Sequence, residues 1–411
     1  MTKKTFFVFK FAIIQKYCIF ANQKTMEIIT NKKNVYKRTS INAKVKRKDK
    51  SNNNKMKKMN EGTNTVFVQR LANARKMRCL SQRELSERLD IQLSANAIAK
   101  YETGKMMPTS EVQAALAIAL GVDVDYFHHP FTVSIPANAW EFRKRKSLGN
   151  KQIAAIQQSA TDQMERINDI EQVCNINQPF QLDYSDTTVA TFLQADAMAR
   201  RLRRELSLGN APIFAPIELL ESLGVRIVEV EADEKFDGTS TKAGNTPLIV
   251  LNATYTPERK RFTLFHELAH LILHFEIGAD VEHLCNTFAS EMLIPVSVLY
   301  TRLGNHRKTL TLEELKGLQR DYGISIEALM YKAHQHGIID DAYFKHFNIK
   351  LNKKTNVNYR DQVRESQWQP ETTTYLRRLV LQALSNELIT PAKAASLLGV
   401  EVDSIQQLVF V

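Results

Sequence analysis

The sequence predicts an α+β protein that is mainly α-helical, with one small sheet in its second half. Residues 65–129 contain a series of helix patterns separated by turn signals. Three short strand patterns follow at 225–230, 236–241 and 247–252. The segment 261–274 is an apolar run without a helix breaker, and helix patterns continue after it to the end of the chain.

Composition and charge set the broad limits. A chain of 411 residues can hold two or three domains, and its 44% hydrophobic content is ordinary for a soluble globular protein. Residues 1–60 hold 17 Lys and Arg against only Glu27 and Asp49, so they account for the whole net charge of +12. We therefore expect 1–60 to be a basic disordered extension, with the true start at one of the later methionines.

The N-terminal residues and the cysteines indicate in which compartment of the cell the protein is expected. Lys10 and Lys16 interrupt the apolar N-terminal run, which argues against a signal peptide. No uncharged span reaches the roughly 18 residues that a membrane helix needs, so we expect no membrane contact. The four cysteines are scattered without a Cys-x-x-Cys pair, which is typical of a reducing, cytoplasmic setting.

The first domain is expected at 65–129. Its first helix covers 66–76, where apolar residues recur on one face. Ser81 to Glu84 forms a capping box for a second helix that ends at Leu89. A third helix is expected over 94–101 with Gly104 after it, and a fourth over 111–120 ended by Gly121.

Residues 80–86 and 98–108 of this domain resemble the Xre class of helix-turn-helix repressors. The motif letters are Leu80-Ser81-Gln82-x-x-Leu85-Ser86, then Ile98-Ala99-Lys100-Tyr101-Glu102-x-Gly104-Lys105-x-x-Pro108. The resemblance implies that the third helix enters the DNA major groove of a double-stranded operator. An alternative is a helix-turn-helix that serves only for protein binding or dimerisation.

The DNA-contacting side chains follow from that docking geometry. The turn at 90–93 is slightly longer than usual, so these positions are set only to within one residue. Base contacts are expected from the start of the third helix and phosphate contacts from the start of the second. The candidates for base contact are Ser94, Asn96, Ala97 and Lys100, and those for the backbone are Gln82 and Arg83.

A helical linker is expected at 130–188 and a second domain at 189–347. The linker carries a helix over 151–173 and a polar loop over 175–186. The second domain combines the three strands with helices at 190–206, 217–223, 261–274, 280–294, 311–322 and 325–337. The corner at 321–325 resembles another helix-turn-helix, but core helices are the preferred interpretation.

The apolar run at 261–274 contains the letters His-Glu-x-x-His. His266 and His270 are four residues apart, so a helix places both imidazoles on one face, where they can bind one Zn²⁺. Glu267 lies beside the first ligand and can act as general base. Glu282, at the start of the next helix, is the expected third ligand of a site that keeps one position open. A buried helix with two partnered histidines is the alternative.

Segments 261–270, 282–289 and 293–295 closely resemble the ImmA/IrrE family of metallo-endopeptidases, with a match from about 191 to 347. The resemblance implies a thermolysin-like core, a glutamate on the following helix as third zinc ligand, and a narrow substrate such as a partner repressor. Cys285 stands where the family usually has Ala. It is expected to be a small core residue, with competition for the metal as the alternative. His274 and His283 are the other competing ligands. His274 is eight residues after His266 and is expected near its face on the same helix, where an ordinary partnered histidine is the preferred interpretation.

A C-terminal helical region is expected at 348–411, with a loop over 348–366 and helices over 371–387 and 391–411. The segment 391–400 is expected to pack or to mediate dimerisation. The whole chain is then interpreted as a homodimeric DNA-binding regulator fused to a zinc peptidase that cleaves a partner repressor. The alternative is a non-proteolytic transcription factor, or an antitoxin-like regulator, whose metal domain is a sensor or scaffold.

Overall fold

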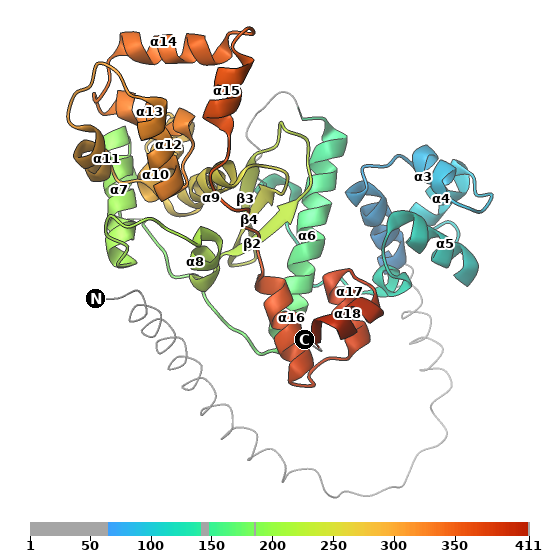
Figure 1. Cartoon of the computed structure of the whole chain (residues 1–411). Helices are drawn as coiled ribbons and strands as arrows, with labels where there is room; N and C mark the ends of the chain where they lie inside the picture. The colour runs from blue at the N-terminus through green and yellow to red at the C-terminus, as the bar shows by residue number, and fades with distance from the viewer. Residues whose placement is uncertain (1–64, 141–147, 185, 410–411) are drawn as a thin grey trace, which may run out of the picture. The chain divides into compact units, whose positions relative to one another are not determined.

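A computed structural model of the chain describes residues 65–140, 148–184 and 186–409 (Figure 1). The predicted basic extension at 1–60 lies outside them. The described residues form one compact, mainly helical unit with small sheets, as the sequence predicts. Among them, no helix is long and apolar enough to span a membrane.

The helix-turn-helix region has the helices that the sequence predicts. A helix over 65–77 comes first. It is followed by α3 (Gln82–Arg88), α4 (Ala95–Glu102), α5 (Ser110–Leu120) and the 3₁₀ turn η1 (Val124–His128). Ser81 forms the predicted capping box with Glu84, and Gly121 ends α5 with a φ of 61°. A left-handed residue without a Cβ closes a helix at low cost, so these boundaries are local in origin.

The small apolar core of this region holds the helices together. Its buried side chains come from every helix and include Phe67, Leu85, Ile98 and Leu116. A charged contact joins the region to the next helix, α6 (Asn150–Val173). Arg70 donates to Glu165 of α6 at 2.6 Å, and both side chains are buried.

The central sheet has three strands in the order β2, β4, β3. β2 (Arg226–Val230) runs parallel to β4 (Thr246–Asn252), and β3 (Gly238–Ala243) runs antiparallel to β4 at the sheet edge. Side chains alternate along β4, so Ile249 and Leu251 enter the larger core while Leu248 and Val250 enter a second one. The predicted strands are therefore present, and both faces of the sheet are covered.

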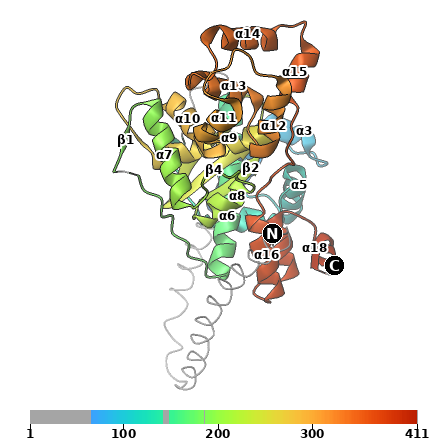
Figure 2. The same ribbon diagram turned by 60° about the vertical axis from the view of Figure 1, so that its left-hand side comes forward.

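The larger core lies between one face of the sheet and helices that come before and after the sheet in the chain (Figure 2). α9 (Pro257–Ile272) packs on β3 and β4, and α10 (Val281–Leu293) packs between α9 and α7 (Phe192–Glu205). A two-residue strand pair, β1 (Thr188–Val189) with β5 (His274–Phe275), follows the end of α9. Further helices of this core are α8 (Pro216–Ser222), α11 (Val296–Leu303), α12 (Leu312–Tyr322) and α13 (Ile326–Gln335). α12 and α13 belong to this core, in agreement with the preferred interpretation.

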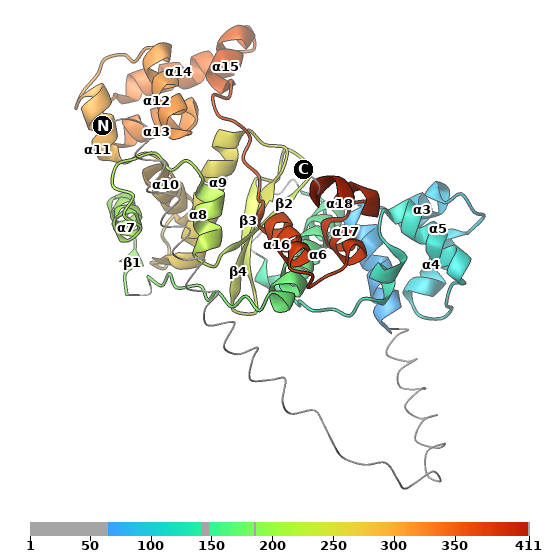
Figure 3. The same ribbon diagram turned by 60° about the horizontal axis from the view of Figure 1, so that its bottom comes forward.

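The second core lies on the opposite face of the sheet, against α6 and the C-terminal helices (Figure 3). α16 (Tyr375–Ser385) contacts α6 and α17 (Pro391–Leu398), and α18 (Val402–Val409) contacts α17. The continuous helix expected over 391–411 is wrong, because Gly399 adopts a φ of 66° and ends α17. The helix expected from residue 371 begins instead at Tyr375.

The predicted loop over 348–366 is also wrong. α14 (Asp341–Asn352) and α15 (Val357–Arg364) occupy most of it. Asp340 caps α14 by accepting from the Tyr343 amide, and Leu351 and Val363 are buried in the larger core. The apolar positions are few and the rest of the segment is polar, so periodicity alone gave no helix signal.

The segment 366–368, which follows α15, holds the start of α9. Glu258 accepts hydrogen bonds from the Ser366 hydroxyl at 2.8 Å and the Gln367 amide at 2.9 Å. Arg261 lies under the Trp368 ring, 4.0 Å from its centroid, and donates to the Gly323 carbonyl. Burial lowers the pKa of Arg261 to about 10, which still leaves it charged at neutral pH. The metal-motif helix is therefore held at its N-terminal end by residues about 100 positions later.

Candidate metal centre

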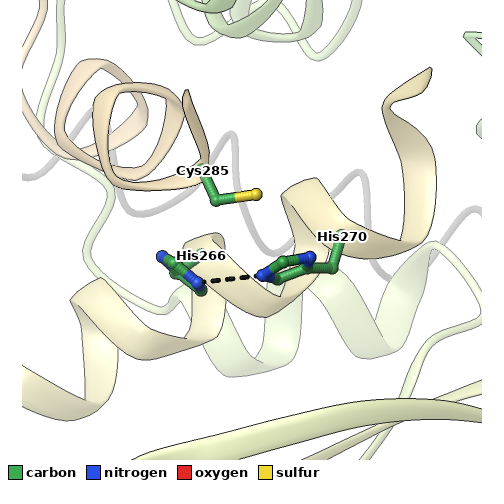
Figure 4. A group of neighbouring side chains, drawn as sticks. All are labelled: His266, His270 and Cys285. Carbon is green, nitrogen blue, oxygen red and sulfur yellow. Dashed lines mark hydrogen bonds between the residues drawn. The ribbon is translucent and has the colours of Figure 1, made fainter. Parts of the chain in front are cut away.

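Helix α9 brings the two motif histidines together. Pro257 begins the helix, which continues without a break to Ile272, so His266 and His270 lie one turn apart. Their Nε2 atoms are 3.1 Å apart (Figure 4). His266 is 1% exposed and His270 is 11% exposed. A tetrahedral Zn²⁺ with nitrogen bonds of about 2.0–2.1 Å places two ligand nitrogens roughly 3.3 Å apart, so this spacing fits one ion.

Glu282 supplies a carboxylate at the same point. It lies in the first turn of α10, which Asp280 caps by accepting from the His283 amide at 3.1 Å. Glu282 Oε1 is 3.5 Å from His270 Nε2, and Glu282 Oε2 is 3.7 Å from His266 Nε2. The carboxylate side chain is 48% exposed, so the group opens to solvent on this side. The structure therefore brings together all three predicted metal ligands.

Asn286 orients the first histidine, a role that we did not predict. Its Oδ1 lies 2.8 Å from His266 Nδ1. An amide oxygen only accepts, so this contact assigns the proton to Nδ1 and leaves Nε2 as the lone-pair donor toward the site. Asn286 is one turn after Glu282 on α10, and this spacing was the only available sequence signal. Such outer partners fix the tautomer and orientation of metal-binding histidines.

Glu267 is held by the edge strand. Ser240 on β3 donates its hydroxyl proton to Glu267 Oε2 over 2.9 Å, and both residues are 2% exposed. The strand approaches α9 closely because Gly238 has no side chain. A Cβ there would lie 2.6 Å from Thr263 Cγ2 and 2.9 Å from the Val250 carbonyl oxygen. We did not predict this role for Ser240, because it depends on how β3 packs against α9.

A buried charge network anchors α10. Lys332 of α13 donates to Glu291 Oε2 of α10 at 2.5 Å, and both side chains are fully buried. Arg200 of α7 donates to the other oxygen of Glu291 at 3.2 Å. Loss of Lys332 would leave the buried Glu291 carboxylate with the partly exposed Arg200 as its ion-pair partner, which is destabilising. The helix that carries Glu282, Cys285 and Asn286 is therefore fixed against two neighbours.

The other predicted competitors have different surroundings. α9 ends at Ile272, so His274 is not on its face but in β5, where it is exposed. The expectation that His274 lies near the face of His266 is therefore wrong. His283 Nδ1 is 3.1 Å from the Tyr331 hydroxyl on α13. Cys285 is buried as predicted, but its sulfur is close to the histidines.

The donors at this site fit Zn²⁺. Imidazole nitrogen, carboxylate oxygen and thiolate sulfur are all common zinc ligands. The two histidine nitrogens are 3.1 Å apart, and the carboxylate oxygens are 3.5 and 3.7 Å from them. These separations are close to those between the ligands of a tetrahedral site. Asn286 supplies the outer hydrogen bond that such a histidine normally has.

The helix-turn-helix region exposes several of its predicted contact residues. Asn96 and Lys100 on α4 and Arg83 on α3 are exposed, and Arg83 pairs with Glu87 at 3.0 Å. Ser94 caps α4 by accepting from the amide of Ala97, which itself packs against the apolar core. Four of the six predicted contact residues are therefore exposed to solvent, and Gln82 and Ala97 are half-buried.

Gln82 and Glu84 are held by partners outside α3. Gln82 donates to Glu102 at 2.8 Å, and Glu102 also accepts from Arg75. Lys151 of α6 donates to Glu84 at 2.8 Å. This bond, with those from Ser81, lowers the pKa of Glu84 to about 2. The start of α3, where phosphate contact is expected, therefore lies beside an additional lysine.

Comparison with known protein families separates the two functional regions. A helix-turn-helix family model matches residues 71–127, which include all six candidate DNA-contact residues. A peptidase M78 model, described as an IrrE N-terminal-like domain, matches residues 220–334. That range includes His266, Glu267, His270 and Glu282. No curated protein matches the chain.

Proposed function

Because the chain carries an Xre-type helix-turn-helix region followed by an ImmA/IrrE-type domain, we propose that it is a DNA-binding regulator with a zinc endopeptidase activity. One observation carries the peptidase part of the proposal. The two imidazole Nε2 atoms are 3.1 Å apart, the Glu282 carboxylate is within 3.7 Å of both, and Glu267 is next to His266 on the same helix. A thermolysin-like arrangement is part of the same proposal.

His266, His270 and Glu282 would hold the metal. Zn²⁺ bound there would polarise water and the scissile carbonyl group. Glu267 takes the proton of the attacking water and passes it to the leaving amine, as a general base and then a general acid. The Ser240 hydroxyl fixes the rotation of the Glu267 carboxylate through its bond to Oε2. Asn286 keeps the His266 ring in the tautomer that binds through Nε2.

The substrate would bind as an extended peptide. β3 bonds to β4 on one side only and forms the edge of the described sheet. A peptide that added a strand to this edge would lie beside Ser240, whose hydroxyl already contacts Glu267. Main-chain pairing recognises any extended segment, so side-chain contacts would have to select the partner. We propose a partner repressor as the cleaved protein.

The DNA part of the proposal rests on α4. Its exposed Asn96 and Lys100 are one turn apart, so both can face one groove. Arg83 at the start of α3 would contact the phosphate backbone. The region after residue 60 has no positive excess to give a single copy tight binding. We therefore propose a homodimer on a palindrome, with half-sites about one helical turn apart. DNA as the target makes a cytoplasmic location the corresponding expectation.

The test uses the purified full-length protein. It would be incubated with the regulator proteins encoded beside its own gene, with and without a metal chelator. We expect one of them to be cut at a discrete site, the cut to stop with chelator, and Zn²⁺ to restore it. Cleavage that ignores the chelator would contradict the zinc mechanism. A metal sensor or scaffold that cuts nothing is the rival function.

A further inference from the structure

A fourth metal donor lies beside the three predicted ligands. Cys285 is on α10, three residues after Glu282, so both side chains project from nearly the same face of that helix. Figure 4 shows its sulfur above the gap between the two imidazoles. The sulfur and one nitrogen of each of His266 and His270 all lie within 4.8 Å of one another.

The distances allow a metal–sulfur bond. Zinc bonds of about 2.3 Å to sulfur and 2.0–2.1 Å to nitrogen place the two ligand atoms roughly 3.5 Å apart in a tetrahedral site. Because the sulfur lies within 4.8 Å of both nitrogens, Cys285 needs to move toward the histidines by roughly 1 Å at most. The imidazoles need almost none, because their Nε2 atoms are already 3.1 Å apart.

Burial distinguishes the thiol from the carboxylate. Cys285 is 0% exposed, whereas the Glu282 side chain is 48% exposed. A buried cysteine is most often a small apolar filler, and that role alone would not bring its sulfur to the histidine nitrogens. With Glu282, the chain offers four donors of the types that zinc prefers. Catalytic zinc sites use three protein ligands and keep one position open, while sites with four protein ligands are closed.

We propose that Cys285 is a fourth metal ligand that closes the site in the resting protein. This inference rests on the proposed zinc site at His266 and His270. Binding would form a metal–sulfur bond in place of the water at the open position and give the thiol proton to solvent. Release of the sulfur would return a water to the metal and a proton to the thiol, so no electron is transferred. Peptide cleavage requires the sulfur to withdraw when a substrate binds, so the site is closed only while no substrate is bound.

The test replaces the native metal in the full-length protein with Co²⁺, whose visible bands report on the number of ligands. A thiolate ligand adds a sulfur-to-cobalt charge-transfer band in the near ultraviolet. We expect wild-type protein to show this band, and Cys285→Ala and Cys285→Ser to bind Co²⁺ without it. Cys174→Ala is the matched control, because Cys174 follows α6 and is half-buried against the other core. The Cys174→Ala protein should keep the charge-transfer band.

A second variant separates the thiol from the carboxylate. Glu282→Ala should still show the charge-transfer band, because His266, His270 and Cys285 remain to hold the ion. Tetrahedral cobalt bands without a charge-transfer band in the wild type would overturn the fourth ligand and leave the three-ligand site intact. A wild-type protein that takes up no Co²⁺ or Zn²⁺ would instead overturn the proposed metal site itself.

Discussion

The metal centre and the DNA-reading helices differ in what holds their functional side chains. At the metal centre, the partners come from distant parts of the chain: Ser240 is 27 residues from Glu267, and Asn286 is 20 residues from His266. On the α3–α4 surface, Arg83 pairs with Glu87 four residues away, and Ser94 caps its own helix. The first site is built by tertiary packing. On the second surface, Arg83 and Ser94 are held by local helix contacts, and Gln82 bonds to the more distant Glu102.

This difference predicts how each region responds to mutation. A buried site with fixed partners loses function in large steps, because a removed group leaves its neighbours unpaired. An exposed helix surface loses single contacts with little effect on folding. The following experiments test this contrast, from the largest expected effect to the smallest.

The largest effect is expected at the histidines. Wild-type protein should carry about one Zn²⁺ per chain. His266→Ala or His270→Ala should lose most of it, because each variant keeps only one of the two imidazole ligands. Metal content is measured by elemental analysis after dialysis. The exposed His346→Ala is the control and should keep its zinc. Full retention of zinc in both the His266→Ala and the His270→Ala proteins would contradict the proposed metal centre.

An intermediate effect is expected for the residues that orient the site. Asn286→Ala should weaken zinc binding on the order of 10- to 100-fold, as loss of an outer histidine partner does. Ser240→Ala should leave zinc binding unchanged and slow cleavage, because a hydrogen bond to a charged carboxylate contributes about 1.5–3 kcal/mol. Chelator competition and the cleavage rate are the two measurements. If Asn286→Ala and Ser240→Ala changed zinc affinity and cleavage rate by the same factors, Asn286 would not act mainly on metal binding or Ser240 mainly on catalysis.

A smaller effect is expected on the DNA side. Asn96→Ala should reduce the preference for the specific operator by about 1–3 kcal/mol, since a lost base contact removes discrimination. Arg83→Ala should weaken all sequences alike and flatten the dependence of affinity on salt, because phosphate contacts carry no sequence information. Binding to specific and random duplexes at several salt concentrations checks both. An Asn96→Ala protein with unchanged preference would mean that α4 does not read bases there.

The smallest effect is a pH dependence of opposite sign at two carboxyl groups, Glu221 on α8 and Glu84 on α3. Burial raises the pKa of Glu221 on α8 to about 6, so the folded state binds the proton more tightly than the unfolded chain. Stability from this group is present below the ordinary pKa and is lost as pH rises through 6, by at most about 2 kcal/mol. Glu84 has a lowered pKa, so its contribution is present above its ordinary value and is lost as pH falls toward 2.

Thermal unfolding between pH 3 and 8 measures this difference. Glu221→Gln should remove the loss of stability above pH 5, and Glu84→Gln should remove part of the loss on acidification. A Glu221→Gln protein with the same pH profile as wild type would show that this buried carboxyl group does not titrate differently on folding.

Much of the fold was predictable because its signals are local. The capping box at Ser81, the left-handed Gly121 and the apolar run of β4 lie within the elements that they define or next to them. Other features had no local signal. α9 ends after Ile272 without a glycine or proline, so His274 was wrongly placed on its face. α14 and α15 are stabilised by a few apolar contacts on otherwise polar helices, and these contacts require the larger core.

The candidate site was predictable to the same degree. His266, Glu267 and His270 form one motif, and Glu282 starts the next helix, so their spacing indicated their chemistry. The roles of Asn286 and Ser240 depend on the packing of α10 and β3 against α9, which periodicity does not describe. The position of Cys285 depends on the same packing. Tertiary contacts therefore add the residues that tune the site rather than those that define it.

The most direct test of the central proposal is Glu267→Gln. The change keeps the size of the side chain and removes the general base, so zinc content should remain near that of the wild type while cleavage of the partner protein falls on the order of 10²- to 10⁴-fold. Zinc content and cleavage rate are measured on the same preparation. A Glu267→Gln protein that binds zinc and cleaves at the wild-type rate would contradict the proposed mechanism.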